Sequence, residues 1–146
     1  MANEIVAQNN NNNGLSGLSV GAVLINTISG DDLESRVLAS NAQSDADSLK
    51  TIGIDTTFLV RNFILQVGVR SRTGELCVET YLICDDGNVY YTQSSGIAKS
   101  AKNFIDCFTD ENGNFNAPCD RGYGFVVREK TLGNGNTLKT LAAVKL

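Results

Sequence analysis

Residues 57–95 read TFLVRNFILQVGVRSRTGELCVETYLICDDGNVYYTQSS, and this stretch decides the expected fold. It is rich in Val, Ile, Leu, Phe, Tyr and Thr, which favour the pleated, half-buried surface of a β-sheet. Two turn signals, Thr73-Gly74 and Asp86-Gly87, divide it into three segments, because glycine accepts the positive φ of tight hairpins. The stretch therefore predicts a three-stranded antiparallel meander.

The two turns also predict which side chains share a face. With two-residue loops, Val69 faces Val78 and Cys84 faces Val89, and directly opposed residues lie on the same side of a sheet. The predicted core face carries Leu65, Val67, Val69, Val78, Leu82, Cys84 and Val89. The opposite face is mixed, and carries Gln66, Arg70, Arg72, Cys77, Glu79, Tyr81, Ile83, Tyr90 and Thr92.

The rest of the chain shows further elements on either side of this meander. Residues 1–19 are a low-complexity, Asn-rich segment that predicts a mobile arm. Residues 20–29 are a candidate strand, and residues 31–43 have the spacing of a short amphipathic helix with Ser29 or Asp31 as its N-cap. A continuous apolar stripe predicts a helix over 96–108. Residues 123–132 and 137–146 predict a terminal hairpin.

The order from residue 57 is strand, strand, strand, helix, strand, strand. This is the order of an OB-fold, so we expect a mainly β protein with minor α content. The expected architecture is a five-stranded antiparallel barrel, with the helix between strands 3 and 4 closing one end. The mobile arm (1–19) would precede one domain (20–146), made of an N-terminal strand and helix extension (20–56) and the barrel (57–146).

Composition limits the classes of protein. The formal charge is −4, with six acidic and two basic side chains in residues 1–50 and ten of each in residues 51–146. Absence of a signal-like or membrane-length apolar run predicts a cytoplasmic protein without membrane contact. Four cysteines without metal spacing, and no histidine, predict free thiols and neither a metal nor a cofactor.

The sequence favours binding over catalysis. Without histidine there is no imidazole base, and no Gly-rich phosphate motif is present. Single-stranded nucleic acid binding requires aromatic faces for stacking and cations for phosphates along one groove. In an OB-fold that groove crosses strands 2 and 3 between the loops joining strands 1–2 and 4–5. The predicted contact residues are Tyr81, Tyr90, Arg70, Arg72, Gln66, Arg128, Lys130 and Lys139.

Three blocks of sequence add a resemblance to a known family. They are NAQSDADSL at 41–49, YLICDDGNVYYTQSSGIAKSAKNFI at 81–105 and FVVREKTLGNGNTLKTL at 125–141. Together with their surroundings they cover about two thirds of the chain and resemble the bacteriophage single-stranded DNA-binding proteins with an OB-fold. The resemblance implies sequence-independent coating of single-stranded DNA during phage replication, in the host cytoplasm. The final residues, Val144-Lys145-Leu146, lack the acidic tip with which bacterial single-strand binders recruit partners, so recruitment by that route is not expected.

Two other functions fit the same residues. One is a structural subunit of a virion or filament, in which the arm and the β-rich core would support strand addition between copies. The other is oligosaccharide binding, because OB grooves also hold sugars and a fold does not fix a function. The expected partners are therefore single-stranded DNA and, in addition, further copies of the same chain.

Overall fold

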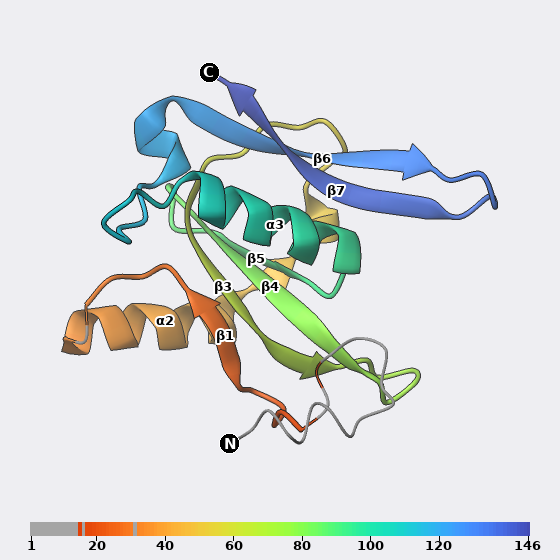
Figure 1. Ribbon diagram of the computed structural model, residues 1–146, viewed down its shortest axis with the longest axis horizontal. Coiled ribbons are helices and arrows are strands. Elements are labelled where there is room, and N and C mark those ends of the chain that lie inside the picture. Colours follow the sequence, from red (N-terminus) through yellow and green to blue (C-terminus); the bar gives the residue numbers. More distant parts are fainter. Residues whose placement is uncertain (1–14, 16, 31) are drawn as a thin grey trace.

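The computed structural model describes residues 15, 17–30 and 32–146 of the chain (Figure 1). It is mainly β with two α-helices, which confirms the predicted fold class. The arm predicted for residues 1–19 lies largely outside the described residues. The elements in order are β1 (Val23–Asn26), α2 (Leu33–Asp45), β2 (Asp47–Ser48), the 3-10 turn η1 (Leu49–Thr51), β3 (Val60–Val69), β4 (Leu76–Cys84), β5 (Val89–Thr92), α3 (Ser95–Cys107), the 3-10 turn η2 (Pro118–Arg121), β6 (Tyr123–Thr131) and β7 (Thr137–Lys145).

The strands form two sheets instead of one closed barrel. A five-stranded sheet has the order β1-β3-β4-β5-β2, and β6 and β7 form a separate hairpin. The two sheets are joined by an isolated bridge in which Phe58 and Phe125 exchange two backbone hydrogen bonds of 2.9 Å. No barrel closure is found among the residues that the structure describes, so the predicted barrel is not confirmed.

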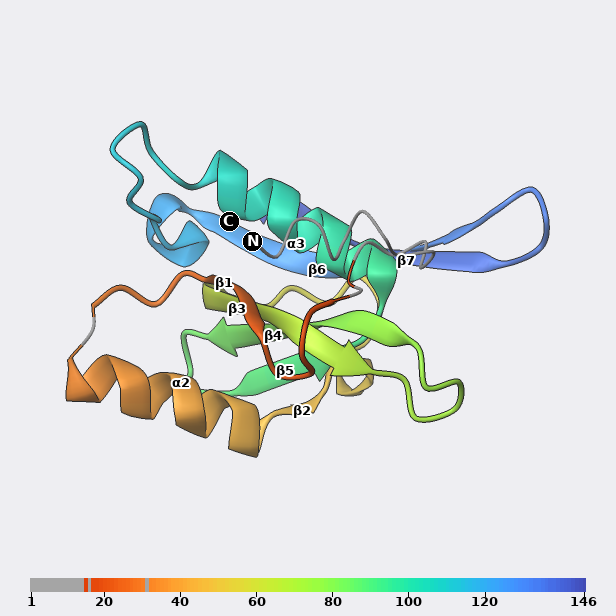
Figure 2. The same cartoon turned by 60° about the horizontal axis from the view of Figure 1, so that its bottom comes forward.

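The main core lies between one face of the five-stranded sheet, α3 and the β6–β7 sheet (Figure 2). Phe125 occupies its centre, in edge-to-face contact with Phe63 and Phe104 at ring-centroid distances of 6.0 and 5.0 Å. The predicted stripe of α3 is confirmed, since Ile97, Ala101 and Ile105 are buried in this core. Ser94 caps the helix by accepting a hydrogen bond from the Ile97 amide.

The β3–β4 hairpin preserves the predicted faces but not the predicted register. Val67 pairs with Val78, and Val69 with Leu76. The loop has four residues, 71–74, because the Arg70 amide donates to the Glu75 carbonyl and the Gly74 amide to the Arg70 carbonyl. A loop two residues longer than predicted shifts the pairs by two positions, and an even shift leaves every side chain on its face.

The β4–β5 hairpin overturns the prediction for the third strand. Its loop has three residues, 85–87, with Gly87 at φ 89°, so Leu82 pairs with Tyr90 and Ile83 with Val89. A single added loop residue turns every side chain of β5 to the opposite face. Tyr90 and Thr92 consequently share the main-core side with Leu82, while Val89 and Tyr91 lie on the other side.

That other side of the sheet is covered by α2 (Figure 2). Ala42 packs in a second core cluster with Ile64, Tyr81, Ile83 and Val89. The helix predicted at 31–43 is confirmed with slightly shifted bounds. Its N-cap is Asp32, whose Oδ1 accepts a 2.8 Å hydrogen bond from the Ser35 amide, and Asp31 lies outside the described residues. The mixed face predicted to be an open binding surface is therefore largely internal.

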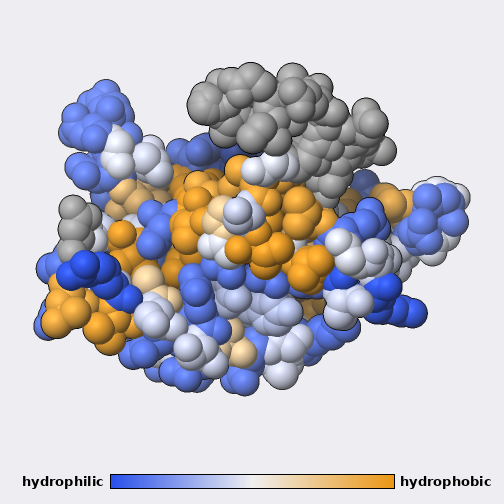
Figure 3. Space-filling view, turned by 90° about the horizontal axis from the view of Figure 1, so that it is seen from below, coloured by the Kyte–Doolittle hydropathy of each residue, from blue (hydrophilic) through white to orange (hydrophobic). Residues whose placement is uncertain are grey.

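The candidate strand at 20–29 is β1, which pairs with β3 at the edge of the sheet. Large apolar side chains remain exposed along it: Val23 is 54% exposed and Leu24 39%. Figure 3 shows that apolar surface gathers on the face of the molecule that is seen from below in the orientation of Figure 1. An edge strand with exposed apolar side chains is a feature that soluble proteins usually avoid.

Candidate functional site

Tyr81, predicted to stack a base, is held inside the protein. It is 7% exposed beneath α2, and its ring stacks on Tyr91 with a centroid distance of 5.5 Å and an interplanar angle of 30°. Burial, reinforced by the charge of Glu79, raises the pKa of Tyr81 to about 12. A ring that is already stacked and buried has no face available for a base.

Gln66, the second predicted contact on this face, belongs to an internal hydrogen-bond network. It accepts from Gln43 Nε2 of α2 at 2.9 Å and donates to Glu79 Oε1 at 3.2 Å. Glu79 reaches across Gly68, where a Cβ would lie only 2.2 Å from the Glu79 carboxyl carbon. Glu79 Oε2 accepts in turn from Gln93 Nε2 at 3.0 Å. The network fixes the end of β5 instead of contacting a ligand.

Tyr90 lies apart from the other predicted contacts. Its ring makes an edge-to-face contact with Phe58, and it lines a recess of about 440 Å³ that also contains Asp85 and Asp86. Burial, followed by the charges of Cys84 and Asp86, raises the pKa of Tyr90. Two carboxylates beside the ring make this recess unfavourable for a phosphate chain.

A different groove brings cations and an aromatic residue together. We call it the polar groove: a cleft of about 570 Å³ between η1 and the loop that follows it, the β5–α3 junction and the β6–β7 sheet. Arg70, at the base of the β3–β4 hairpin, reaches it from the side. The polar and aromatic residues that line the polar groove include Lys50, Arg70, Tyr91, Gln93, Glu129 and Lys139.

Local structure positions each cation of the polar groove. Arg70 Nη2 donates a 3.1 Å hydrogen bond to the backbone carbonyl of Gln93. The side chain of Gln93 is held in turn by its hydrogen bond to Glu79. Lys139 pairs across the hairpin with Glu129, on the face of the sheet that carries Val127 into the core. Lys50 lies in η1, where Ser48 is the N-cap and accepts a hydrogen bond from the Lys50 amide. Three cations thus oppose one carboxylate.

The remaining predicted contacts do not line this groove. Arg128 and Lys130 alternate with Val127 and Glu129 along β6, so their side chains lie on the opposite face of the hairpin. Arg72 is exposed in the β3–β4 loop. Of the eight predicted contact residues, only Arg70 and Lys139 line the polar groove.

Sequence reasoning missed Lys50, Tyr91 and Glu129. The signal for Tyr91 was present but assigned to the wrong parity, because the β4–β5 loop is one residue longer than the turn motif indicates. Glu129 shares parity with Val127, which the hairpin at 123–146 places on the core side. Nothing in the sequence around Lys50 indicated that η1 packs beside β5 and lines the same cleft as Lys139 of β7.

Neither a protein-family model, nor a curated protein, nor a solved structure matches the chain. The residues that the structure describes contain no group of three or more His, Cys, Asp or Glu able to hold a metal ion. No helix within the same residues is long and apolar enough to cross a membrane. The phage-family resemblance therefore rests on the three sequence blocks alone.

Proposed function

We propose that the chain binds single-stranded DNA without sequence specificity and without catalysis, along the polar groove. The observation that carries this proposal is that three cations and one carboxylate line the polar groove together with Tyr91, in a protein whose formal charge is −4. In this proposal Lys50, Arg70 and Lys139 contact phosphates, and the Tyr91 ring, one face of which stacks on Tyr81, contacts a base with its other face. Binding of this kind requires local positive charge and not a basic protein as a whole.

The arrangement of strands supports the same function. From β3 to β7 the order matches an OB-fold, and the Phe58–Phe125 bridge joins the segment that leads into the first strand of that series to the fourth strand. We therefore propose an open, OB-like arrangement of the two sheets. The groove of an OB-fold lies between its first and last hairpins. Here Arg70 comes from the first hairpin and Lys139 from the last, on either side of the polar groove.

The direct test is fluorescence anisotropy with labelled oligothymidylate and a matched duplex, at low and moderate salt. We expect preference for the single strand and an affinity that falls as salt rises, because bound phosphates release counterions. Affinity for neither nucleic acid would refute the proposal. Affinity that salt leaves unchanged would contradict a phosphate-dominated site, and competition by free sugar would favour the oligosaccharide alternative.

Paired variants locate the site. Lys50→Ala with Lys139→Ala removes two charges from the polar groove, and Arg128→Ala with Lys130→Ala removes two from the opposite face of β6. We expect the first pair to lower the slope of log affinity against log salt by about 1.4, since each single-strand contact contributes about 0.7. The second pair is the matched control. Equal losses in both would show that net charge, and not the polar groove, sets the affinity.

The aromatic contact has its own test. Tyr91→Leu keeps apolar packing against Tyr81 but removes the π face. A stacked base contributes about 1–3 kcal/mol, so we expect this variant to lose affinity within that range. Unchanged affinity in a folded Tyr91→Leu protein would exclude Tyr91 from the contact surface.

The edge strand β1 favours self-assembly as a second candidate function. Its exposed Val23 and Leu24 stand on a sheet edge to which no other described strand pairs, and such an edge is a template for strand addition between copies. Sedimentation without nucleic acid distinguishes the two functions. Large assemblies in the absence of DNA would favour a structural subunit, and a small particle that binds oligothymidylate would favour the first proposal.

A further inference from the structure

A second groove adjoins the polar groove at the N-terminus of α3. We call it the aliphatic groove: a cleft of about 710 Å³ between β1, the β3–β4 hairpin and α3. Its floor includes Leu24, Leu65, Val78 and Ala98, and no aromatic residue lines it among those described.

Arg70 makes the two grooves neighbours. It lines both of them, and the consecutive residues Ser94 and Ser95 line the polar and the aliphatic groove respectively. The Gln93 carbonyl that holds the Arg70 guanidinium immediately precedes this junction. A linear ligand that leaves the polar groove over Arg70 therefore enters the aliphatic groove without crossing another element.

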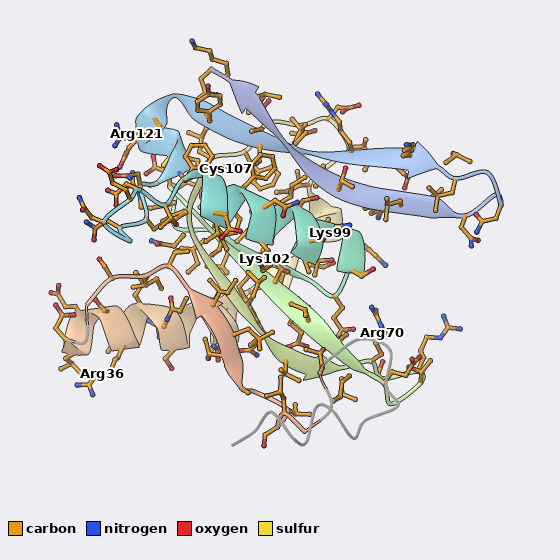
Figure 4. All side chains as sticks on the ribbon, in the orientation of Figure 1. Arg36, Arg70, Lys99, Lys102, Cys107 and Arg121 are labelled. Carbon is orange, nitrogen blue, oxygen red and sulfur yellow. The ribbon has the colours of Figure 1, made fainter. Side chains whose placement is uncertain are left out.

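The rim of the aliphatic groove is cationic. Lys99 and Lys102 of α3 line it together with Arg70, against the single carboxylate of Glu75. Figure 4 shows Lys99 and Lys102 on α3 and Arg70 at the base of the β3–β4 hairpin, on the same side of the molecule. Lys102 lies 3.7 Å from Asp106 in an exposed pair, while Lys99 forms no ion pair with any residue that the structure describes.

We propose that the aliphatic groove continues the single-stranded DNA path, with Lys99 and Lys102 contacting phosphates beyond Arg70. This inference rests on the proposed function of the polar groove. Charge complementarity and continuity at Arg70 favour a polyanionic strand as the occupant. Aliphatic side chains accept the apolar faces of bases but do not stack as aromatic rings do, so this half contributes to affinity mainly through phosphates.

The proposal predicts that binding depends on oligonucleotide length. Oligothymidylates of about 5 and about 16 nucleotides bracket the usual size of such sites. The longer one should show the steeper dependence of affinity on salt. Lys99→Ala with Lys102→Ala should lower the salt slope for the longer strand by about 1.4, or by about 0.7 if Asp106 already neutralises Lys102. The same variant should leave binding of the shorter strand unchanged.

Each of these variants has a control that makes the same change of charge away from both grooves. Arg36→Ala with Lys145→Ala also removes two charges, from residues that line neither groove. Leu24→Glu places a negative charge inside the aliphatic groove and should weaken only the longer strand. Leu33→Glu, at a position that is 69% exposed on α2, is its control. Equal effects of a variant and its control would overturn the proposal.

The outcomes separate this inference from the proposed function. Failure of the wild-type protein to bind either length would refute single-strand binding altogether. Binding of both lengths with the same salt slope, or a longer-strand slope that Lys99→Ala with Lys102→Ala does not change, would overturn only the continuation. The latter result would leave the aliphatic groove as a site for an apolar protein segment.

Discussion

Gly96→Ala tests the contact that places Lys139 in the polar groove. Gly96 lies in the first turn of α3, where a Cβ would stand 2.2 Å from the Lys139 carbonyl oxygen and 2.8 Å from Leu138 Cδ1. Ordinary van der Waals contact begins at 3.4 Å, so α3 and β7 must separate by about 1 Å. The carbonyl is backbone and cannot rotate aside.

The sign of the effect depends on two opposing free energies. Replacing glycine by alanine within a helix stabilises it by up to about 1 kcal/mol through propensity. Overpacking a close contact costs about 1–3 kcal/mol. We therefore expect Gly96→Ala to lower the free energy of unfolding by up to about 2 kcal/mol, and to weaken oligothymidylate binding because Lys139 moves with its strand.

Urea unfolding followed by circular dichroism measures this difference. Asn103→Ala, at an exposed position of the same helix, serves as the control that reports propensity alone. If Gly96→Ala stabilised the protein by about 1 kcal/mol, as helix propensity alone predicts, the close approach of α3 to β7 would be refuted.

Three further predictions concern stability. Thr80 Oγ1 is buried and has no hydrogen-bond partner among the residues that the structure describes, so Thr80→Val should stabilise the protein by about 1 kcal/mol in urea unfolding; a loss would reveal a further partner. Burial raises the pKa of Tyr81 from 10.0 to about 12 and that of Cys84 from 9.0 to about 12. Both groups ionise first in the unfolded chain, so the free energy of unfolding should fall as pH rises from about 9 to about 12. Tyr81→Phe should reduce that fall, and a pH profile identical to the wild type would contradict burial of the phenol. Arg61 bridges Asp85 and Asp120, so Arg61→Ala should cost about 1 kcal/mol, less in high salt, and an effect independent of salt would argue against an ionic contribution.

The sequence predicted the elements more reliably than the faces they present. The α3 stripe, the terminal hairpin and the meander all correspond to strong local patterns, and each appears within a few residues of its predicted bounds. The sequence indicates the length of a hairpin loop less clearly than it indicates the presence of a strand or helix. The same Gly-containing signal closes a four-residue loop at Gly74 and a three-residue loop at Gly87. Only the odd change exchanges the faces, which is why Tyr90 was assigned to the wrong side.

The covering of the sheet by α2 was not predictable from local pattern. Alanines 39, 42 and 46 face the sheet, and the large apolar residues Leu33, Val37 and Leu38 remain exposed. A periodicity argument assigns the larger residues to the buried side. The small alanine side chains occupy the buried side of α2 because they allow the helix to approach the Tyr81 and Tyr91 rings closely. Because α2 covers the sheet face that carries Tyr81, this face is not open to a ligand, and the candidate site is the polar groove at its border.

The Phe58–Phe125 bridge has a mechanical consequence. Among the described residues, few backbone hydrogen bonds join the two sheets, so the core between them contributes much of their contact, including the edge-to-face pair of Phe63 and Phe125. Apolar contacts have no preferred direction, unlike the ladder within a sheet. A small shift of the β6–β7 hairpin relative to the five-stranded sheet would therefore break few backbone hydrogen bonds, and its cost would lie in repacking the aromatic contacts. If the polar groove binds single-stranded DNA as proposed, a cleft whose two walls share few backbone hydrogen bonds could adjust its width to purines and to pyrimidines, and this adjustment would contribute to indifference to base identity.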